Sequence, residues 1–354
     1  MSTLTTPYRT YDLFVALDVD KNSYAVTVND AHNIERSKKM PANPESFYNY
    51  IQKTYPDKRA LFAYEAGPTG YGLHDYLASK EQRCLVISPN AIPKASNDKV
   101  KTNRLDSKRL SELVKAGVVD SIRVPDESFR DLRHLVNTRQ DYVKKQIAAK
   151  QRIESLLLFQ GLHNCVGEHK RWSRHHLKIL EELSCSPAVR ERLNALLDDL
   201  NYARTKLLYF HKVIKEFCAG HPHIQKNIDY IRSIPGIGFV TSTYVLSRIG
   251  DPSHLKNVRE LGAFAGVVPT EHSTGETIHK GHITHMGNET MRHLLVEAAW
   301  IAIRKDPELG FFYNRIKNRH PHSGGAQIAI VAVARKLTHR IHKVLKEQRM
   351  YVVL

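Results

Sequence analysis

The sequence predicts a mixed α/β domain, a long helical arm and a mostly helical C-terminal domain, in that order along 354 residues. The first third alternates short apolar runs with amphipathic stretches, as strands separated by helices do. The middle third keeps apolar residues at helical spacing, and the last third has short helical patterns interrupted by glycines. These changes predict domains over residues 1–122, 123–224 and 225–354.

Each element of the first domain has a local signal. The apolar runs 13–17 and 24–28 predict two strands that pair as a hairpin, and the second run stops at the turn residues Asn29 and Asp30. The loop 67–70 contains two glycines and a proline and separates a strand from a helix. The other expected elements are a helix over 46–55, a strand over 60–64, a helix from 71 to 77, a strand over 84–87 and a helix over 106–115.

The middle segment predicts two long helices. Apolar residues recur every three to four positions from Leu132 to Leu157 and again from Leu193 to Phe210, and no proline or glycine interrupts the first stripe before Gly161. An antiparallel or coiled-coil arm fits this pattern, and a compact helical subdomain is the alternative. A long exposed helical arm usually buries its stripe against a partner, often a second copy of itself.

The charge indicates a polyanionic partner. Lys and Arg number 53 against 36 Asp and Glu, which gives a net charge of +17. The excess is +3 over residues 1–120, +6 over 121–225 and +8 over 226–354. Nucleic acid is the expected partner; a basic surface that serves only solubility is the alternative.

Targeting and redox signals indicate a cytoplasmic protein. The sequence has no run of about 18 apolar residues, so no membrane-spanning helix is expected, and its N-terminus lacks the apolar core of a signal peptide. The four cysteines form no CxxC pair and are expected to be reduced thiols. They are Cys84, Cys165, Cys185 and Cys218.

Three acidic residues follow or flank the predicted strands of the first domain. Asp18 and Glu65 each end a strand, and Asp106 opens a helix. Carboxylates that converge at such an edge repel one another unless cations neutralise them, and a pair of Mg²⁺ ions there would activate a phosphodiester. This is the arrangement of an RNase H-like nuclease centre; solvated acids at strand ends are the simpler alternative.

The pentapeptide Ile234–Gly238, IPGIG, lies between two helical patterns of the last domain. Its glycines permit a tight turn that leaves backbone N–H groups free at the next helix N-terminus, which suits a phosphate. We therefore expect nucleic-acid contact at Gly236 and Gly238, as in helix-hairpin-helix modules. An ordinary helix–helix turn is the alternative.

A hydroxyl-rich loop follows the hairpin. Ser273 and Thr274 precede a glycine, and a serine hydroxyl can act as a nucleophile when a base, a metal or pre-set geometry activates it. His279, His282 and His285 recur every three residues, but no cysteine or clear fourth ligand accompanies them, so phosphate contact is favoured over zinc. Lys280 and Arg292 are expected to contact phosphate as well.

Six motifs together resemble a known family. In order they are ALDVDK with Asp18, YEAGPTGY with Glu65, KVKTNRLDSKRL with Asp106, IPGIG, GAFAGVVPTEHSTGE and HITHMGNETMRHLLVEAAW. They resemble the DEDD-type transposases of insertion sequences, relatives of the Piv DNA invertases, and more narrowly the branch guided by a bridge RNA or seekRNA.

The resemblance implies a RuvC-like, RNase H-like domain over 1–122, a coiled-coil arm over 123–224 and a transposase domain over 225–354 that carries the serine. It implies a metal site of Mg²⁺ or Mn²⁺ at the acidic residues, and a serine that forms a covalent adduct with DNA. It also implies three kinds of partner: donor and target DNA, a non-coding guide RNA, and other copies of the chain in a homo-oligomer, a dimer or a tetramer. The expected location is the bacterial cytoplasm, at the nucleoid.

Two departures from the family pattern affect the site. The third acid of the family falls on Asn103, whose amide oxygen ligates Mg²⁺ more weakly than a carboxylate; Asp98 and Asp20 are the possible substitutes. The serine that often directly precedes the glycine falls on Thr274 here. Ser273 is the first choice as nucleophile because it is the only serine in the loop, and Thr274, which the register favours, is the second. The family's lysine before Gly-Asn is His285 here.

The expected function is RNA-guided, serine-dependent DNA strand exchange with a metal at Asp18, Glu65, Asn103 and Asp106. Lys101 and Arg104, beside the last two residues, are expected to contact nucleic acid. A metal-dependent junction nuclease of RuvC type is one alternative, and the serine loop argues against it. A non-catalytic nucleic-acid-binding protein is the other, and Asn103 in place of an acid favours it.

Overall fold

The computed structural model describes residues 10–30, 35–89, 103–119, 121–166, 171–255, 257–274, 277–283, 286–321 and 324–352. Contacts within the chain define two compact units, residues 1–124 and 125–354, so the helical arm groups with the C-terminal helices. Each unit is considered by itself. Within the described residues, no helix combines the length and apolarity needed to cross a membrane.

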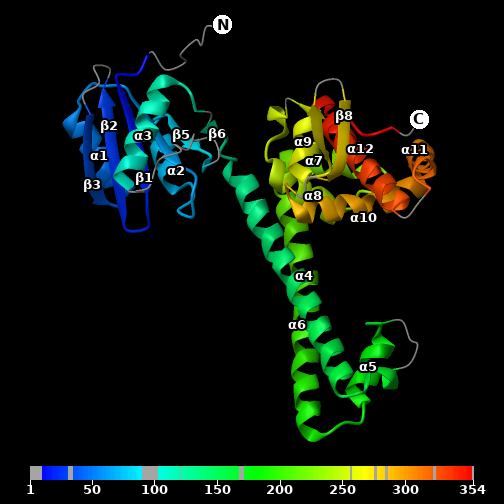
Figure 1. Cartoon of the computed structure of the whole chain (residues 1–354). Helices are drawn as coiled ribbons and strands as arrows, with labels where there is room; N and C mark the ends of the chain where they lie inside the picture. The colour runs from blue at the N-terminus through cyan, green and yellow to red at the C-terminus, as the bar shows by residue number, and fades with distance from the viewer. Residues whose placement is uncertain are drawn as a thin grey trace. The chain divides into compact units, whose positions relative to one another are not determined.

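The first unit is built on a six-stranded mixed sheet with helices against it (Figure 1). The strand order is β3-β2-β1-β4-β5-β6; β1, β4 and β5 are parallel neighbours, and the remaining pairs are antiparallel. The strands are β1 (Leu13–Val19), β2 (Ser23–Asp30), β3 (Glu35–Pro41), β4 (Ala60–Glu65), β5 (Cys84–Ile87) and β6 (Ser121–Ile122).

Alternation along the central strands gives the sheet two apolar faces. One face packs against α1 (Pro44–Thr54) and α2 (Gly72–Ser79), through buried residues such as Phe47 and Leu77. The other face packs against α3 (Asn103–Ala116), where Leu110 and Val114 contact the strands. The sheet is therefore covered on both sides, and α3 alone among these helices covers the second face.

The predicted strands and helices of this unit are confirmed, and two strands were missed. β3 has the sequence ERSKKMP, whose charges hide any apolar alternation, and it lies at the sheet edge, where lysines discourage pairing with another chain. β6 has only two residues. The prediction failed at both because an edge strand buries too little apolar surface to leave a pattern.

The second unit begins with two helices of 33 residues each, α4 (Glu127–Phe159) and α6 (Pro187–Ala219). They are connected through η2 (His163–Val166) and α5 (Arg174–Glu182), and they run side by side over their lengths (Figure 1). Leu132 and Val136 share a core with Ile214, whereas Ile153 shares another with Leu196, so the pair is antiparallel. The prediction of two long paired helices is confirmed; a coiled-coil contact with a second copy stays a prediction.

The rest of the second unit is a helical body around α12 (Gly325–Glu347), whose apolar face is buried along its whole length. A β-hairpin interrupts the helices, although the sequence pattern predicted a loop around Ser273 and His282. The other elements are α7 (Pro222–Arg232), α8 (Phe239–Ile249), η3 (Pro252–His254), α9 (Val258–Ala265), β7 (Pro269–Thr274), β8 (Thr277–Ile283), α10 (Glu289–Lys305) and α11 (Pro307–Arg319).

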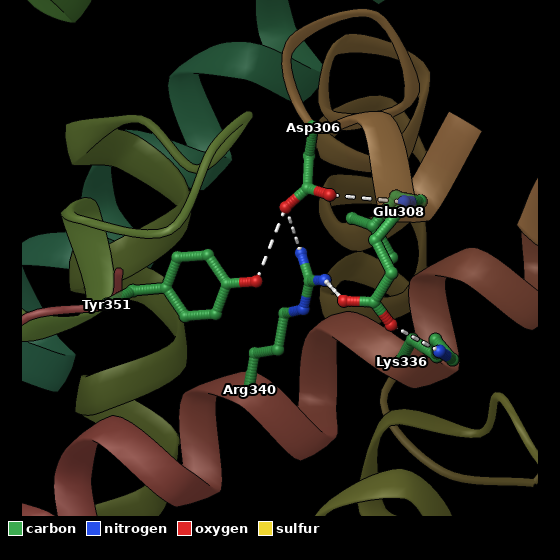
Figure 2. Close-up of polar contacts among 6 residues, drawn as sticks. Asp306, Glu308, Lys336, Arg340 and Tyr351 are labelled. Atoms are coloured by element: carbon green, nitrogen blue, oxygen red, sulfur yellow. Dashed lines mark hydrogen bonds and ion pairs between the residues drawn. The ribbon is translucent and has the colours of Figure 1, made fainter. Parts of the chain in front are cut away.

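An ion-pair network with a buried Asp306–Arg340 pair joins α12 to α11 and to the junction of α10 with α11 (Figure 2). Asp306, between α10 and α11, is 1% exposed and accepts a hydrogen bond of 2.6 Å from Nη1 of Arg340 on α12. Nη2 of Arg340 donates to Glu308 at 2.7 Å, and Lys336 donates to the other oxygen of Glu308 at 2.9 Å. The hydroxyl of Tyr351 also donates to Asp306 at 3.3 Å. Burial favours the neutral acid, but these bonds and the Arg340 charge outweigh it and lower the pKa of Asp306.

Replacing Arg340→Met should destabilise the protein by about 3–5 kcal/mol, because it leaves the Asp306 carboxylate buried without its cation. Urea unfolding measures the change. Arg349→Met is the matched control: Arg349 pairs with Glu347 on the surface, and its loss should cost no more than about 1 kcal/mol. Equal effects of the two substitutions would contradict a structural role for the buried pair.

Candidate catalytic edge and nucleic-acid surface

Asp18 and Glu65 lie at the ends of neighbouring parallel strands. The register of β1 and β4 pairs Leu17 with Tyr64, so Asp18 and Glu65 are the next residues in register. Ala16 and Ala63, two residues earlier, are buried on the α3 face of the sheet, and alternation assigns both acids to that face. Asp18 is half-buried and Glu65 is exposed, so the sheet edge that they form is open to solvent.

Helix α3 brings its N-terminal turn to the same edge. The hydroxyls of Thr27 and Ser107 are 2.9 Å apart, and Thr27 pairs with Ala16; Nζ of Lys115 donates to the carbonyl of Asp30, opposite Leu13, at 2.6 Å. The helix therefore runs antiparallel to β1, with its first residues towards Asp18.

The position of Asn103 follows from this direction. Asn103 lies about 6 Å before Ser107 along the helix axis, and Asp18 lies about 6–7 Å beyond Ala16 along the strand. Along the direction of β1, residue 103 therefore lies at the same height as Asp18. Asp106 lies about one helical turn further along α3, towards the start of β1, on the side of the helix that carries Leu110. The side chain of Asn103 lies outside the described atoms.

The donor chemistry of this edge fits a hard divalent cation, since carboxylate and amide oxygens are the ligands that Mg²⁺ prefers. Within the described parts of the chain, no three His, Cys, Asp or Glu side chains lie close enough to hold a metal ion. Asp18, Glu65 and Asp106 therefore share one edge and one face without forming a closed metal cluster by themselves.

Of the two possible substitutes for the missing acid, the structure describes only Asp20. Asp98 lies outside the described residues, as does Lys101, and the side chain of Arg104 is not described. Asp20 lies in the β1–β2 turn, where it accepts a hydrogen bond from the backbone N–H of Lys21 at 2.7 Å. It lines a cavity of about 530 Å³ with residues that include Tyr24, Thr69 and Leu73, but neither Asp18 nor Glu65 reaches this cavity.

In the second unit the serine lies on a hairpin strand. The register of β7 and β8 pairs Ser273 with Ile278 and Thr274 with Thr277, so both candidate nucleophiles are in the last two residues before the hairpin turn. His279 and Lys280 lie on β8. The side chains of Ser273, Thr274, His279, Lys280 and His282 are not described, and His285 lies outside the described residues. The zinc alternative therefore stays untested.

The two glycines of the IPGIG turn have different roles. Gly236 has a φ of +90°, and a Cβ atom there would lie 2.4 Å from the carbonyl oxygen of Ala298 and 2.8 Å from the amide of Ala302 on α10. Gly238 begins α8 without a side-chain cap, and a Cβ atom would meet nothing within 4 Å. Packing therefore explains Gly236, whereas Gly238 leaves an accessible helix N-terminus suited to a phosphate.

Arg292 has a partly structural role. Its Nη1 donates long hydrogen bonds of 3.5 Å to the carbonyls of Gly266 and Met286, which joins the end of α9 to the segment after the hairpin. The side chain is half-buried. A phosphate contact at Arg292 stays a prediction.

Comparison with known proteins agrees with this geometry. A transposase family model of the DEDD type matches residues 15–160, and the model described as "Transposase IS116/IS110/IS902 family" matches residues 228–314. The first range includes Asp18, Glu65, Asn103 and Asp106, and the second includes the IPGIG turn and Ser273. These two matches define the class of protein as a transposase.

The relatives define the family. "Putative transposase y4qE" of Sinorhizobium fredii is 30% identical over 84% of this chain and 74% of its own length. The transposase of insertion sequence IS1533 of Leptospira borgpetersenii is 24% identical over 94% of this chain and 95% of its own. The pilin gene-inverting protein of Moraxella bovis is 24% identical over 51% of this chain and 56% of its own. This chain belongs to the IS110/IS116/IS902 family of transposases.

Gly236→Ala should destabilise the second unit by more than about 1 kcal/mol, since the new methyl group meets backbone of α10 and the φ is strained for alanine. Gly238→Ala should leave stability within about 1 kcal/mol, because its surroundings are open. Urea unfolding of the two variants tests the assignment. A destabilisation by Gly238→Ala as large as that by Gly236→Ala would refute the division of roles.

Proposed function

We propose that this transposase exchanges strands between donor and target DNA at a metal-dependent acidic edge, with a serine as the nucleophile and a non-coding RNA as the guide. The register that sets Asp18 beside Glu65 is the observation that carries the metal site. The strand order β3-β2-β1-β4-β5, with its parallel centre, supports the RNase H-like interpretation of the first unit. The family match supports DNA as substrate.

Asp18 and Glu65 would hold a divalent cation together with Asp106 and Asn103. Bound Mg²⁺ or Mn²⁺ supplies Lewis-acid polarisation of a phosphodiester. The chain contributes the fixed spacing of the two strand ends and an edge open enough for a polymer. Asn103, level with the two strand carboxylates, is the residue whose replacement by an acid would strengthen the site most.

The serine would attack the DNA directly. A bond forms between Oγ of Ser273 and phosphorus while the bond from phosphorus to the 3′ oxygen breaks, and the released 3′ hydroxyl takes up the proton. A 3′ hydroxyl of the second DNA then forms a bond to phosphorus while the bond from phosphorus to Oγ breaks, and its proton returns to the serine, so the exchange conserves the phosphodiester energy. Thr274 is the alternative nucleophile. Support for this step comes from the family resemblance and from the hydroxyls beside the hairpin turn.

Asp18→Ala and Glu65→Ala should each lower strand exchange by at least about 100-fold, because each removes a charge that stabilises the transition state through the cation. Binding of duplex DNA should persist in both. Glu112→Ala, which changes an exposed acid on the outer side of α3, is the control and should retain activity. Wild-type exchange in Asp18→Ala would exclude the acidic edge as the catalytic site.

Asn103→Asp sharpens the same test. The new carboxylate should lower the Mg²⁺ or Mn²⁺ concentration needed for half-maximal activity, since a charged ligand binds these ions more strongly than an amide. An unchanged metal dependence would remove residue 103 from the ligand set.

A covalent-adduct assay tests the nucleophile. Incubation with Mg²⁺, labelled donor and target DNA and RNA transcribed from the element's flanking DNA should give an RNA-dependent adduct on a denaturing gel. Ser273→Ala should abolish the adduct and Thr274→Val should retain it; the reverse result would assign the role to Thr274. Cleaved DNA without an adduct would identify a junction nuclease of RuvC type, and binding without cleavage a non-catalytic protein.

A further inference from the structure

The middle of the α4–α6 arm lacks the apolar core that holds its two ends. No residue from 137 to 148 on α4 is buried, and from 201 to 213 on α6 only Ala203 is. One core, around Val136 and Ile214, holds the helices together at the end of the arm next to the helical body. A second core, around Ile153 and Leu197, holds them together at the other end. The side chains of the middle stretch are thus available for another task.

Four aromatic rings occupy this stretch. Tyr142 stacks on Phe210 with ring centroids 5.6 Å apart, and Tyr202 meets Tyr142 edge-on at 6.1 Å. Tyr209 meets Phe210 edge-on at 5.3 Å. Tyr202 is 56% exposed and Tyr209 is 55% exposed. Two large rings are therefore presented to solvent on a support of two partly buried rings.

Lysines accompany the rings. Nζ of Lys145 lies 4.7 Å from the Tyr142 ring, and Nζ of Lys206 lies 5.5 Å from Tyr202 and 5.4 Å from Tyr209. Residues 137–150 and 200–215 together hold eight Lys or Arg side chains and one acid, Asp141. A positive surface with exposed aromatic rings is how proteins bind single-stranded nucleic acid, by stacking bases and attracting the backbone.

The positive surface continues towards the IPGIG turn. The ring of His211 packs against the ring of Phe239 with centroids 5.1 Å apart, and the Arg232 guanidinium lies 6.0 Å from the centroid of the same Phe239 ring. Phe239 is the first residue of α8, whose N-terminus has no side-chain cap at Gly238. Burial and the charges of Arg139 and Lys215 lower the pKa of His211, which favours its neutral ring, so the positive charge beside Phe239 comes from Arg232. The chain thus connects the arm rings to a helix N-terminus suited to phosphate.

We propose that the surface formed by Tyr202, Tyr209, Lys145 and Lys206, here called the arm platform, binds an unpaired stretch of nucleic acid whose backbone continues towards the N-terminus of α8. The inference rests on the proposed nucleic-acid function and adds a site that the acidic edge and the serine do not provide. A second copy of the chain is the competing occupant. Charge favours nucleic acid, because symmetric contact of two copies would bring two strongly positive surfaces together.

Fluorescence anisotropy with the full-length protein tests the platform. The probes are labelled oligo-U, oligo-dT and a duplex, each of about 20 nucleotides, longer than one site of this kind. Tyr202→Ala/Tyr209→Ala should weaken single-strand binding about tenfold or more, because two stacked bases lose their support. Tyr202→Phe/Tyr209→Phe should bind like the wild type, and duplex binding should change much less in both. Tighter binding of oligo-U than of oligo-dT would identify RNA as the strand, and the reverse would identify DNA.

Leu208→Ala separates the two occupants. Leu208 is 75% exposed beside Tyr209 and carries neither ring nor charge. If the platform binds nucleic acid, Leu208→Ala should keep the wild-type affinity for single strands. The tyrosine variants should keep the wild-type oligomeric state, as measured by light scattering. Equal losses of affinity in Leu208→Ala and the alanine double variant, with smaller oligomers, would assign the surface to a second copy. Wild-type affinity in the double variant would overturn the platform alone, and a wild-type protein that binds no probe would overturn the proposed function with it.

Discussion

The parallel pairing of β1 with β4 is the constraint on which the proposed catalytic edge depends. Because Leu17 pairs with Tyr64, the next residues are two acids on one face of the sheet. Carboxylate oxygens are ligands that a divalent cation prefers, and this register places two of them at one edge. A slip of one residue would send Asp18 and Glu65 to opposite faces. The register therefore decides whether the two acids can act together.

In the second unit the elements are held in place mainly by contacts inside the core. α12 fills the core, Asp306 and Arg340 pair inside it, and Gly236 lets the turn before α8 approach α10 at backbone distance. The turn is thus held rigidly against a buried helix while the amide groups that follow Gly238 stay accessible. Such a combination suits a phosphate contact, because the protein orders nothing further when the ligand arrives.

Most of the first unit could be predicted from the sequence because its strands are buried and apolar. β3 and β6 could not, since edge strands need little apolar surface. The acids at strand ends and the IPGIG turn were recognisable as local patterns, but the level of Asn103 beside Asp18 depends on how α3 docks, which no local pattern contains. The hairpin around Ser273 was missed because its strands are polar and glycine-containing. Tyr142 and Phe210 belong to the two apolar stripes of the sequence, whereas the exposed rings of Tyr202 and Tyr209 beside them were not recognised, because helical spacing does not show which rings stay exposed.

The two separate cores of the arm have an evolutionary consequence. Each end of α4 and α6 is stabilised independently, so substitutions at positions such as Tyr202, Lys206 or Leu208 leave the folding of the helices intact. Selection can therefore alter the middle of the arm freely while the ends stay under packing constraint. The proposed arm platform therefore lies in the part of the arm where the sequence can change at the least cost to the fold.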